Sequence, residues 1–401
     1  MDATTFPTGA ASPPPTSSHG TSGGGRWCWV NEHHHRLAIF ADMGGLHILL
    51  ACLTSALGVA LVIPALIRLS ERFDLLDHPN EHRKHHAKPI PHVGGLAILL
   101  GLGLAMLTYL IPMKSTPQGI IFLLLGILLL GGVGVRDDIA SLSPAGKFLA
   151  QLIIASIVVV LGEYRLQSMY GLLGIDMVAD SWATIISIPF LLVFINAYNL
   201  IDGMDGLAGS LALMGLSFLG VWFLTFDNPL HATLALSTCA ALLAFLVYNW
   251  HPARIFLGDT GSMILGLIIG CLVLEYLAMN KLQFDIGSNM TSGTPALAFA
   301  TLIIPLTDLV RVFVTRLLAG RSPFAADNEH VHHLLQRTGR RIPQIVLFLT
   351  GVQIMVFGLS FLLKNEIHWL LITVLNIVFS WICIWLFVKT GRTSSSVLDD
   401  S

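Results

Sequence analysis

The chain has 401 residues, of which 54% are hydrophobic and only 11% are charged, and its mean hydropathy is +0.75. A soluble domain carries about 25% charged residues, so this composition excludes a soluble globular protein and indicates a polytopic membrane protein. The net charge of -2 gives no sign of a nucleic-acid partner.

The first 45 residues differ from the rest of the chain and predict a flexible or disordered flank. Residues 10–25 consist mostly of Pro, Ser, Thr and Gly, which cannot bury a core. No basic segment is followed directly by an apolar one, so a cleavable signal peptide is not expected. We expect a membrane domain over residues 46–389 and a short tail over residues 390–401.

Apolar runs follow one another along the remaining sequence, and crossing a bilayer takes about 20 such residues. They predict an all-α polytopic membrane protein with about eleven transmembrane helices. The expected spans are residues 46–69, 93–111, 120–135, 147–162, 182–197, 207–226, 230–248, 262–278, 296–318, 342–363 and 369–388.

Five polar segments interrupt the apolar runs, and helix counting places all five on the same side of the membrane. They are rich in Asp, Asn, His or Arg and cover residues 77–95, 136–144, 196–206, 249–262 and 320–339. Most of the basic residues lie on or beside that side. The positive-inside rule therefore predicts that these loops and the carboxyl terminus are cytoplasmic and that the amino terminus is outside.

The 77–95 segment is basic and stiffened by prolines. Its Arg83 and Lys84 are candidates for contacts with anionic headgroups or with a phosphorylated substrate. An ordinary positive-inside loop is the alternative interpretation.

Two adjacent carboxylates, Asp137 and Asp138, end the third apolar run. Such charges repel each other at a membrane surface unless a cation or a basic group compensates them, which suggests a divalent metal. Hydrated Asp residues in an interfacial loop are the alternative. Just beyond, Ser143 and Pro144 are typical of a helix start and place Lys147 in the first turn of the next helix.

The 196–206 segment carries Asn196, Asn199, Asp202 and Asp205 at intervals of three residues. On a helix this spacing lines the polar groups along one face. The alternative for Asp205 is that it caps the following helix. Capping leaves the other three residues unexplained, because each costs free energy at the end of an apolar span.

The 249–262 segment contains Arg254 and then the sequence Gly258-Asp259-Thr-Gly-Ser before another apolar run. Glycines let a ligand approach the backbone closely, and the amides at a helix start suit a phosphate. The alternative for Asp259 is an N-cap of the following helix.

The 320–339 segment joins a basic residue, Arg321, to three histidines, His330, His332 and His333. Histidines can bind zinc, whereas Mg²⁺ prefers oxygen ligands and is usually held by carboxylates together with substrate phosphates. The carboxylates of the other segments therefore suggest Mg²⁺, which leaves the histidines to contact phosphate oxygens. An amphipathic surface helix is the alternative interpretation.

Taken together, the five ordered motifs resemble the polyprenyl-phosphate N-acetylhexosamine-1-phosphate transferases, the glycosyltransferase 4 family, over about residues 71–339. The Gly-Arg-Ser-Pro-Phe sequence from Gly320, with Asp327 and the histidines, is similar to the WecA/TagO-type branch that uses UDP-N-acetylglucosamine. The peptidoglycan branch usually has three consecutive histidines, and Val331 interrupts that run here.

The resemblance implies transfer of N-acetylglucosamine 1-phosphate from UDP-N-acetylglucosamine to undecaprenyl phosphate, with release of UMP, at the bacterial inner membrane. Membrane lipid is therefore an expected partner, and a homodimer is one option because related enzymes often form dimers. The alternatives are a phospho-N-acetylmuramoyl-pentapeptide transferase and, from another class, a transporter. Glu163, Glu275 and Asp308 lie in or near apolar spans, as in translocation paths, but we expect Asp308 to pair with Arg311 one turn away.

The same resemblance implies an active site with Mg²⁺, or Mn²⁺ in its place. It places Asn199 and Asp259 next to the metal and Asp137 and Asp138 beside it, with Asp137 aligning or deprotonating the lipid phosphate. The other expected catalytic residues are Asp202, Asp205, His330, His332 and His333. The expected substrate-binding residues are Arg83, Lys84, Lys147, Asn196, Arg254 and Arg321.

Overall fold

A computed structural model of the chain describes residues 45–72, 76–77, 90–113, 115–285, 294–318, 320 and 331–399. The chain divides into two units, Met1–Asp42 and Met43–Ser401, and only the second contains described residues. The predicted flank therefore lies outside the described residues, apart from Gly45.

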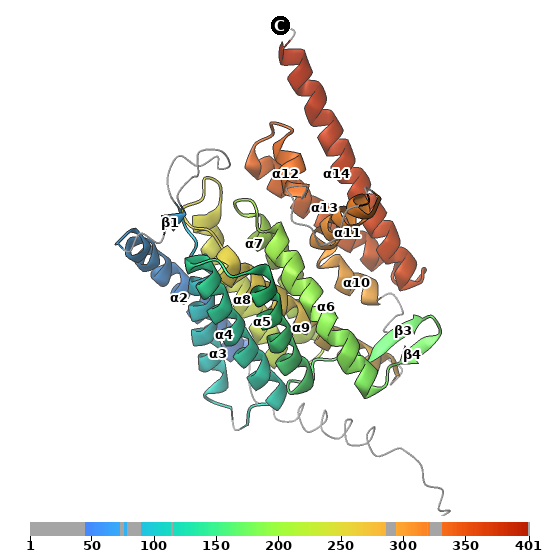
Figure 1. The fold of residues 1–401 in the computed structure, drawn as a ribbon. Coiled ribbons are helices and arrows are strands. Elements are labelled where there is room, and N and C mark those ends of the chain that lie inside the picture. Colours follow the sequence, from blue (N-terminus) through green and yellow to red (C-terminus); the bar gives the residue numbers. More distant parts are fainter. Residues whose placement is uncertain are drawn as a thin grey trace, which may run out of the picture. The chain divides into compact units, whose positions relative to one another are not determined.

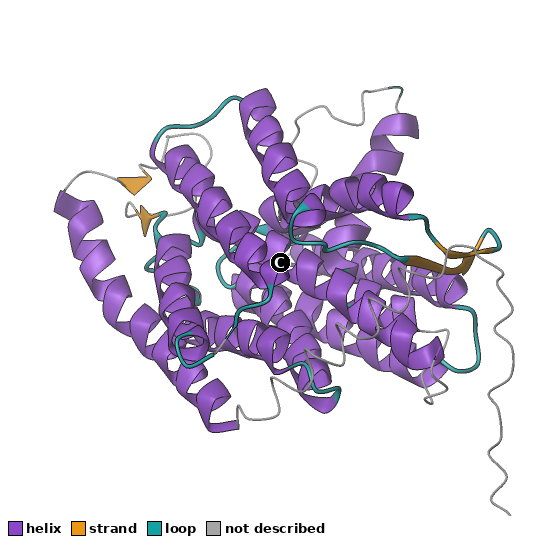
Figure 2. Ribbon diagram, turned by 90° about the horizontal axis from the view of Figure 1, so that it is seen from below, coloured by secondary structure: helices purple, strands orange, loops and turns teal. Residues whose placement is uncertain are grey.

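Among the described residues of the second unit most are helical, and the strands form two small antiparallel pairs, β1 with β2 and β3 with β4 (Figure 2). Figure 1 labels most of these elements. Their order is α2 (Gly45–Arg72), β1 (Leu76–Asp77), β2 (Ile90–Pro91), α3 (Gly94–Leu110), α4 (Gln118–Ile139), α5 (Pro144–Val160), β3 (Ser168–Leu172), β4 (Ile175–Met177), α6 (Asp180–Ile201), α7 (Leu207–Thr225), α8 (Pro229–Asn249), α9 (Gly258–Asp285), α10 (Thr294–Ala300), α11 (Ile303–Leu318), α12 (Val331–Gln336), α13 (Ile342–Leu363) and α14 (Trp369–Asp399).

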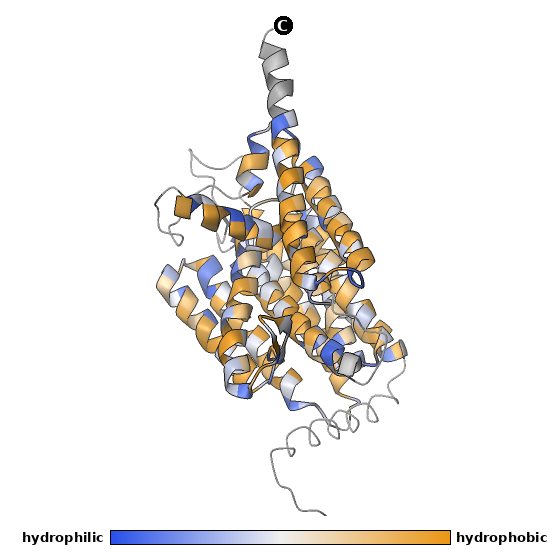
Figure 3. Ribbon diagram, turned by 90° about the vertical axis from the view of Figure 1, so that its right-hand side faces the viewer, coloured by the Kyte–Doolittle hydropathy of each residue, from blue (hydrophilic) through white to orange (hydrophobic). Residues whose placement is uncertain are grey.

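The predicted all-α membrane class is confirmed, because each of the predicted apolar runs is mostly helical. Among the described residues, eight helices are long and apolar enough to cross a membrane, namely α2, α4, α6, α7, α8, α9, α13 and α14. The helices α3 and α5 are also apolar but have only 17 residues each. Figure 3 shows hydrophobic residues along the outer helices, where a hydrocarbon phase would contact them.

The prediction of one continuous helix over residues 296–318 is wrong, because the chain there is divided into α10 and α11. Pro305 lies in the first turn of α11 and has no N–H to donate to the carbonyl of Thr301, as a continuous helix would require. The Thr301 carbonyl instead accepts a hydrogen bond of 3.3 Å from Nε2 of Gln353, a buried residue of α13. Gln353 thus satisfies the carbonyl that the helix break leaves without an intrahelical partner.

Helix α9 lies in close contact with both α4 and α6, and glycines at the contacts allow this approach. A Cβ atom on Gly134 of α4 would lie 2.3 Å from Cα of Thr260 in α9. A Cβ atom on Gly266 of α9 would lie 2.6 Å from Cα of Ile195 in α6. The start of α9 is therefore held between the carboxyl-terminal ends of α4 and α6.

The β3–β4 hairpin and α12 lie at opposite ends of the helices (Figure 1). The hairpin joins α5 to α6 and is fixed by the indole of Trp369, whose Nε1 donates to the carbonyl of Tyr170 at 3.1 Å. Lys281 at the end of α9 forms a 2.8 Å ion pair with Asp176 in β4. The hairpin with its contacts to Trp369 and Lys281 therefore lies away from the end of the bundle that carries α12.

Candidate active site

The ammonium group of Lys147 joins three oxygen-bearing side chains from three different helices. Its Nζ atom lies 2.9 Å from Oδ2 of Asp137, 2.6 Å from Oδ1 of Asp259 and 3.3 Å from Oδ1 of Asn199. Asn199 also donates through Nδ2 to Oδ1 of Asp259. We refer to Asp137, Lys147, Asn199 and Asp259 as the Lys147 cluster.

The members of the Lys147 cluster differ in how far they are open to solvent. The side chain of Asp259 is 32% exposed, that of Lys147 18% and that of Asp137 only 7%. Both carboxylate oxygens of Asp137 are already engaged, since Oδ1 accepts a 2.6 Å bond from the backbone N–H of Leu142. Asp259 is therefore the carboxylate of the cluster that a soluble ligand reaches most easily.

Asp138 organises the start of α9 from the neighbouring helix α4. Its Oδ1 accepts a 2.7 Å bond from the backbone N–H of Asp259. Its Oδ2 accepts from the backbone N–H of Thr260 at 3.1 Å and from the Thr260 hydroxyl at 2.6 Å. The interpretation of Asp259 as an N-cap is thus wrong: Asp259 lies in the first turn of α9, and Asp138 accepts the hydrogen bonds of that turn.

Gly258 makes this arrangement sterically feasible. It begins α9 with φ 73°, a left-handed conformation that glycine adopts without strain. A Cβ atom there would lie 2.9 Å from both carboxylate oxygens of Asp138. The glycine that the sequence suggests for ligand approach therefore also gives room to a carboxylate of the protein itself.

Asp205 and Asn249 tie the connection after α6 to the connection after α8. Oδ2 of Asp205 accepts bonds from Nδ1 of His251 at 2.8 Å and from the backbone N–H of Ala253 at 3.2 Å. In return, Oδ1 of Asn249 accepts a 2.9 Å bond from the backbone N–H of Gly206. The interpretation of Asp205 as a cap of α7 is wrong, because Gly206 occupies the N-cap position without a side-chain cap bond.

Sequence reasoning missed Asn249 and His251 as individual contributors to this site. The available signal was Asn249 itself, an amide at the end of an apolar helix, where a polar group needs a partner. Its Nδ2 donates to the carbonyl of Ile255 at 2.8 Å. The Asn249 side chain therefore contacts both the loop after α8 and, through Gly206, the loop after α6.

Asp202 directly follows α6 and lies among other acidic groups. Burial raises the pKa of Asp202 to about 8, and the negative charges of Asp259, Asp138 and Asp205 contribute to the increase. The neighbouring carboxylates thus destabilise the charged form of Asp202. A further cation at the site would relieve this repulsion.

His332 places the described part of the 320–339 segment against the loop that follows α6. A Cβ atom on Gly203 would lie 2.2 Å from Nε2 of His332, so the imidazole packs directly against the Gly203 backbone. His333 lies in α12, but its side chain is not among those described. The predicted site residues His330 and Arg321 lie outside the described residues, and so do Arg83 and Lys84.

The carboxyl-terminal end of the 77–95 segment contacts the loop before α9. The backbone N–H groups of Gly94 and Gly95 donate to the carbonyls of Phe256 at 2.9 Å and Leu257 at 2.8 Å. A Cβ atom on Gly95 would lie 2.0 Å from the backbone nitrogen of Gly261. Described parts of all five polar segments therefore meet at one end of the bundle, as the helix count predicts.

Two predicted substrate-binding residues have no described contact with the Lys147 cluster. Nδ2 of Asn196 donates to Oε1 of Gln151 at 3.1 Å and links α6 to α5 inside the bundle. The guanidinium of Arg254 lies 4.8 Å from the ring centroid of Tyr248 and donates to the carbonyl of Val247 at 3.2 Å. Substrate binding by Asn196 and Arg254 therefore stays a prediction.

The donor set of the Lys147 cluster fits Mg²⁺. Mg²⁺ in proteins is usually held by one or two carboxylates and by substrate phosphates, and it retains several waters. Asp137, Asp259 and the amide oxygen of Asn199 already surround one cationic atom, the Nζ of Lys147. Within the described residues no group of three or more His, Cys, Asp or Glu side chains is arranged to hold a metal, so the protein ligands available in the cluster are two carboxylates and one amide oxygen.

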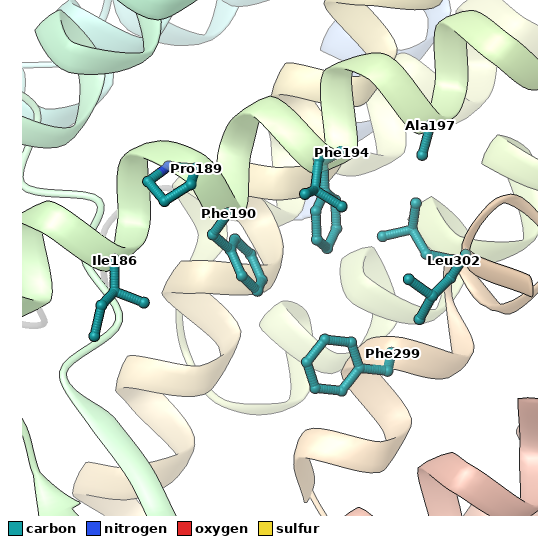
Figure 4. A pocket seen from close by; sticks show the side chains of 9 residues that line it. Ile186, Pro189, Phe190, Phe194, Ala197, Phe299 and Leu302 are labelled. Atoms are coloured by element: carbon teal, nitrogen blue, oxygen red, sulfur yellow. The ribbon is translucent and has the colours of Figure 1, made fainter. Parts of the chain in front are cut away.

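An apolar cavity of about 270 Å³ lies beside α6, between this helix and the break that separates α10 from α11. Figure 4 shows side chains of α6 facing Phe299 and Leu302 across it. Along α6 the lining runs from Ile186 to Ala197, a distance of about 16 Å at the rise of an α-helix. Its lining residues are Ile186, Pro189, Phe190, Val193, Phe194, Ala197, Phe299, Leu302 and Leu306.

Comparison with known proteins adds to this geometry. Residues 120–277 match glycosyl transferase family 4. A probable undecaprenyl-phosphate N-acetylglucosaminyl 1-phosphate transferase of Bacillus subtilis is 32% identical over 83% of this chain and 89% of its own length. A decaprenyl-phosphate N-acetylglucosaminephosphotransferase of Mycobacterium leprae is 29% identical over 72% of this chain and 77% of its own. An Escherichia coli undecaprenyl-phosphate alpha-N-acetylglucosaminyl 1-phosphate transferase is 28% identical over 71% and 75%.

Proposed function

The chain belongs to glycosyl transferase family 4, and from this membership we propose that it transfers N-acetylglucosamine 1-phosphate from UDP-N-acetylglucosamine to undecaprenyl phosphate. The reaction releases UMP and leaves the sugar on a lipid diphosphate in a bacterial membrane. One observation carries the proposal: α6 contributes Asn199 to a polar cluster suited to phosphate chemistry and also lines an apolar cavity.

The two parts of α6 match the two parts of a polyprenyl phosphate. Asn199 lies in the Lys147 cluster, and Ala197, two residues earlier, lines the apolar cavity. Residues two apart on a helix point about 200° apart, so the cavity lies on the other face of α6 from the Lys147 cluster. A lipid whose phosphate contacts the cluster would therefore pass around the end of α6 to place its first isoprene units against these apolar side chains. Burial of those units is favourable only where the lining is apolar, and all nine lining residues are.

The reaction joins an oxygen of the lipid phosphate to the phosphorus that carries the sugar, and the bond from that phosphorus to the UMP oxygen breaks. The second pKa of a phosphate monoester is about 6, so the acceptor is mostly a dianion at neutral pH and needs little further deprotonation. The main barrier is repulsion between this dianion and the diphosphate. Positioning and charge stabilisation dominate such transfers.

Mg²⁺ is part of the proposal, with Mn²⁺ as a substitute. Asp259 and Asn199 would hold the ion with Asp137 beside it, and the ion would supply positive charge that offsets the repulsion between the two substrates. Lys147 adds a second positive charge within 3.3 Å of the same three side chains, where it is placed to contact a phosphate oxygen. Asp138 holds the first turn of α9 so that the Asp259 carboxylate keeps its orientation.

We further propose that the end of the bundle carrying the Lys147 cluster faces the cytoplasm. Basic residues are concentrated in the loops at that end, as the positive-inside rule requires. UDP-N-acetylglucosamine is a soluble, charged donor that cannot cross the hydrocarbon core, so the cluster has to be open to the compartment that contains it. The exposed part of the Asp259 side chain meets this requirement.

A UMP-release assay tests the function directly. Purified protein with undecaprenyl phosphate, UDP-N-acetylglucosamine and Mg²⁺ is expected to release UMP, and an excess of EDTA is expected to stop the release. UDP-N-acetylmuramoyl-pentapeptide is expected to be a poor donor. Vesicles that accumulate a solute without UMP release would instead support a transporter.

Filling the apolar cavity tests whether it holds the prenyl chain. Ala197→Leu is expected to raise KM for undecaprenyl phosphate by about tenfold, because the added methyl groups occupy space that the lipid needs. KM for UDP-N-acetylglucosamine is expected to stay within about twofold, since the cavity is separate from the polar cluster. Steady-state kinetics with each substrate varied in turn measures both values.

Ala65→Leu is the matched control for the cavity, because Ala65 is an exposed position of α2. It is expected to leave both KM values unchanged. An equal rise of the two KM values in the Ala197 variant would argue against a lipid site in the cavity.

A further inference from the structure

A buried ion pair lies in α11, outside the Lys147 cluster. Oδ1 of Asp308 accepts a 3.0 Å bond from Nη2 of Arg311, and both side chains are buried. A buried charged pair costs desolvation free energy and is by itself weak evidence of a stabilising role. The expected pairing of Asp308 with Arg311 is confirmed, and it leaves open what the pair is for.

The same carboxylate oxygen of Asp308 reaches a second helix. Oδ1 also accepts a 2.8 Å bond from the backbone N–H of Val331, the first residue of α12. The first N–H groups of a helix have no partner within it, and a negative charge near them is favourable. Asp308 therefore does for α12 what a capping residue does, from a position 23 residues earlier in the chain.

Helix α12 depends on such external contacts for its place. It has six residues, Val331–Gln336, which is too few for an isolated helix to be stable in water. The side chain of Val331 is fully buried, and the bond to Asp308 fixes its backbone. The position of the next residue, His332, follows from the position of this first turn.

The imidazole of His332 packs tightly against the backbone of the loop that joins α6 to α7. Its Nε2 would lie 2.2 Å from a Cβ atom on Gly203, so the imidazole occupies the space that any larger residue would fill. Gly203 follows Asp202 directly, in the loop that joins α6 to α7. A small shift of α12 would therefore remove the imidazole from the acidic end of α6.

We propose that Asp308 is a positioning residue for His332, acting through the backbone of Val331 and held in orientation by Arg311. It touches neither substrate, and its effect on the reaction passes through the placement of the imidazole. This inference rests on the proposed function for its kinetic consequence, but the placement of His332 can be measured without any turnover.

Three variants test the inference through UMP-release kinetics. Asp308→Ala removes the acceptor of both bonds and is expected to lower kcat/KM by about 10²-fold, the usual cost of misplacing a reacting group by about 1 Å. Asp308→Asn keeps an oxygen that can accept the Val331 N–H and is expected to lie between Asp308→Ala and the wild type. Thr307→Val is the control, since the Thr307 hydroxyl is buried without a described partner and its loss is expected to leave kcat/KM unchanged.

Carbethoxylation of histidines by diethyl pyrocarbonate, located by peptide mass spectrometry, provides the second measurement. His332 is 4% exposed, and His231, at the start of α8, is 8% exposed and serves as an internal control. In Asp308→Ala, His332 is expected to react several-fold faster than in the wild type while His231 keeps its rate. Asp308→Asn is expected to show a smaller change at His332 and supplies the test if the Ala variant does not fold.

The possible results separate this inference from the proposed function. Wild-type protein that releases no UMP would refute the proposed function. The comparison of the carbethoxylation rates of His332 and His231 would still test whether Asp308 positions His332. The inference would be overturned if Asp308→Ala had the same kcat/KM and the same rate of His332 carbethoxylation as the wild type. Equal acceleration at His332 and His231 would also overturn it, because Asp308 would then hold the bundle as a whole.

Discussion

Replacement of Asp259 by Asn is expected to lower the rate of UMP release by roughly 10³-fold or more, the scale on which charged groups act in phosphoryl transfer. The substitution removes the negative charge that lies 2.6 Å from the ammonium of Lys147 and that we assign to the metal. It keeps the size of the side chain. The bond that Asp138 accepts comes from the backbone N–H of residue 259, so the first turn of α9 is expected to persist.

This expected pattern distinguishes a catalytic loss from a folding defect. UMP release measures the activity, and thermal unfolding of the purified protein measures the fold, which we expect to be close to that of the wild type. Asp180→Asn is the matched control, because Asp180 is an exposed carboxylate at the opposite end of α6. Full activity in Asp259→Asn would remove this carboxylate from the mechanism.

Lys147→Met is expected to abolish UMP release and to make the stability of the protein depend on Mg²⁺. The variant keeps an unbranched side chain but leaves Asp137, whose side chain is 7% exposed, without its cation 2.9 Å away. Leaving a buried charge unpaired costs about 3 kcal/mol. A divalent cation bound by Asp137, Asn199 and Asp259 would restore part of this free energy, because a ligand that binds only the folded state stabilises it.

Thermal unfolding with increasing Mg²⁺ concentrations checks this prediction. We expect Mg²⁺ to raise the Tm of Lys147→Met more than the Tm of the wild type, because the ion replaces the missing positive charge. Lys364→Met, which changes a lysine just after α13, is expected to respond like the wild type. Identical Mg²⁺ responses in Lys147→Met and the wild type would argue against a metal at these three side chains.

Local patterns in the sequence predict several parts of the site. Ser143 and Pro144 predict the start of α5, and the structure has Ser143 as the N-cap, with its hydroxyl accepting from the backbone N–H of Gly146 at 3.2 Å. That start places Lys147 where it reaches Asp259, 112 residues away in sequence. A helix start can be predicted from the sequence because capping depends on residues only a few positions apart.

The different roles of the carboxylates cannot be predicted from local sequence patterns in this way. Asp137 and Asp138 are adjacent and chemically identical, yet one pairs with Lys147 and the other holds the first turn of α9. Adjacent residues on a helix point about 100° apart, so they meet different neighbours. Which neighbours these are depends on the packing of α4 against α5 and α9.

The sequence by itself determined the membrane class, the positions of the apolar helices and the grouping of the polar segments, because hydrophobicity and helix counting depend on local composition and length. Only the tertiary structure decided that Asp205 joins two loops, that Asp308 reaches α12 and that Gln353 satisfies the carbonyl left at the break before α11. Each of these depends on a partner far away in the chain, such as His251, Val331 or Gln353. Packing creates such partners, and no local pattern encodes them.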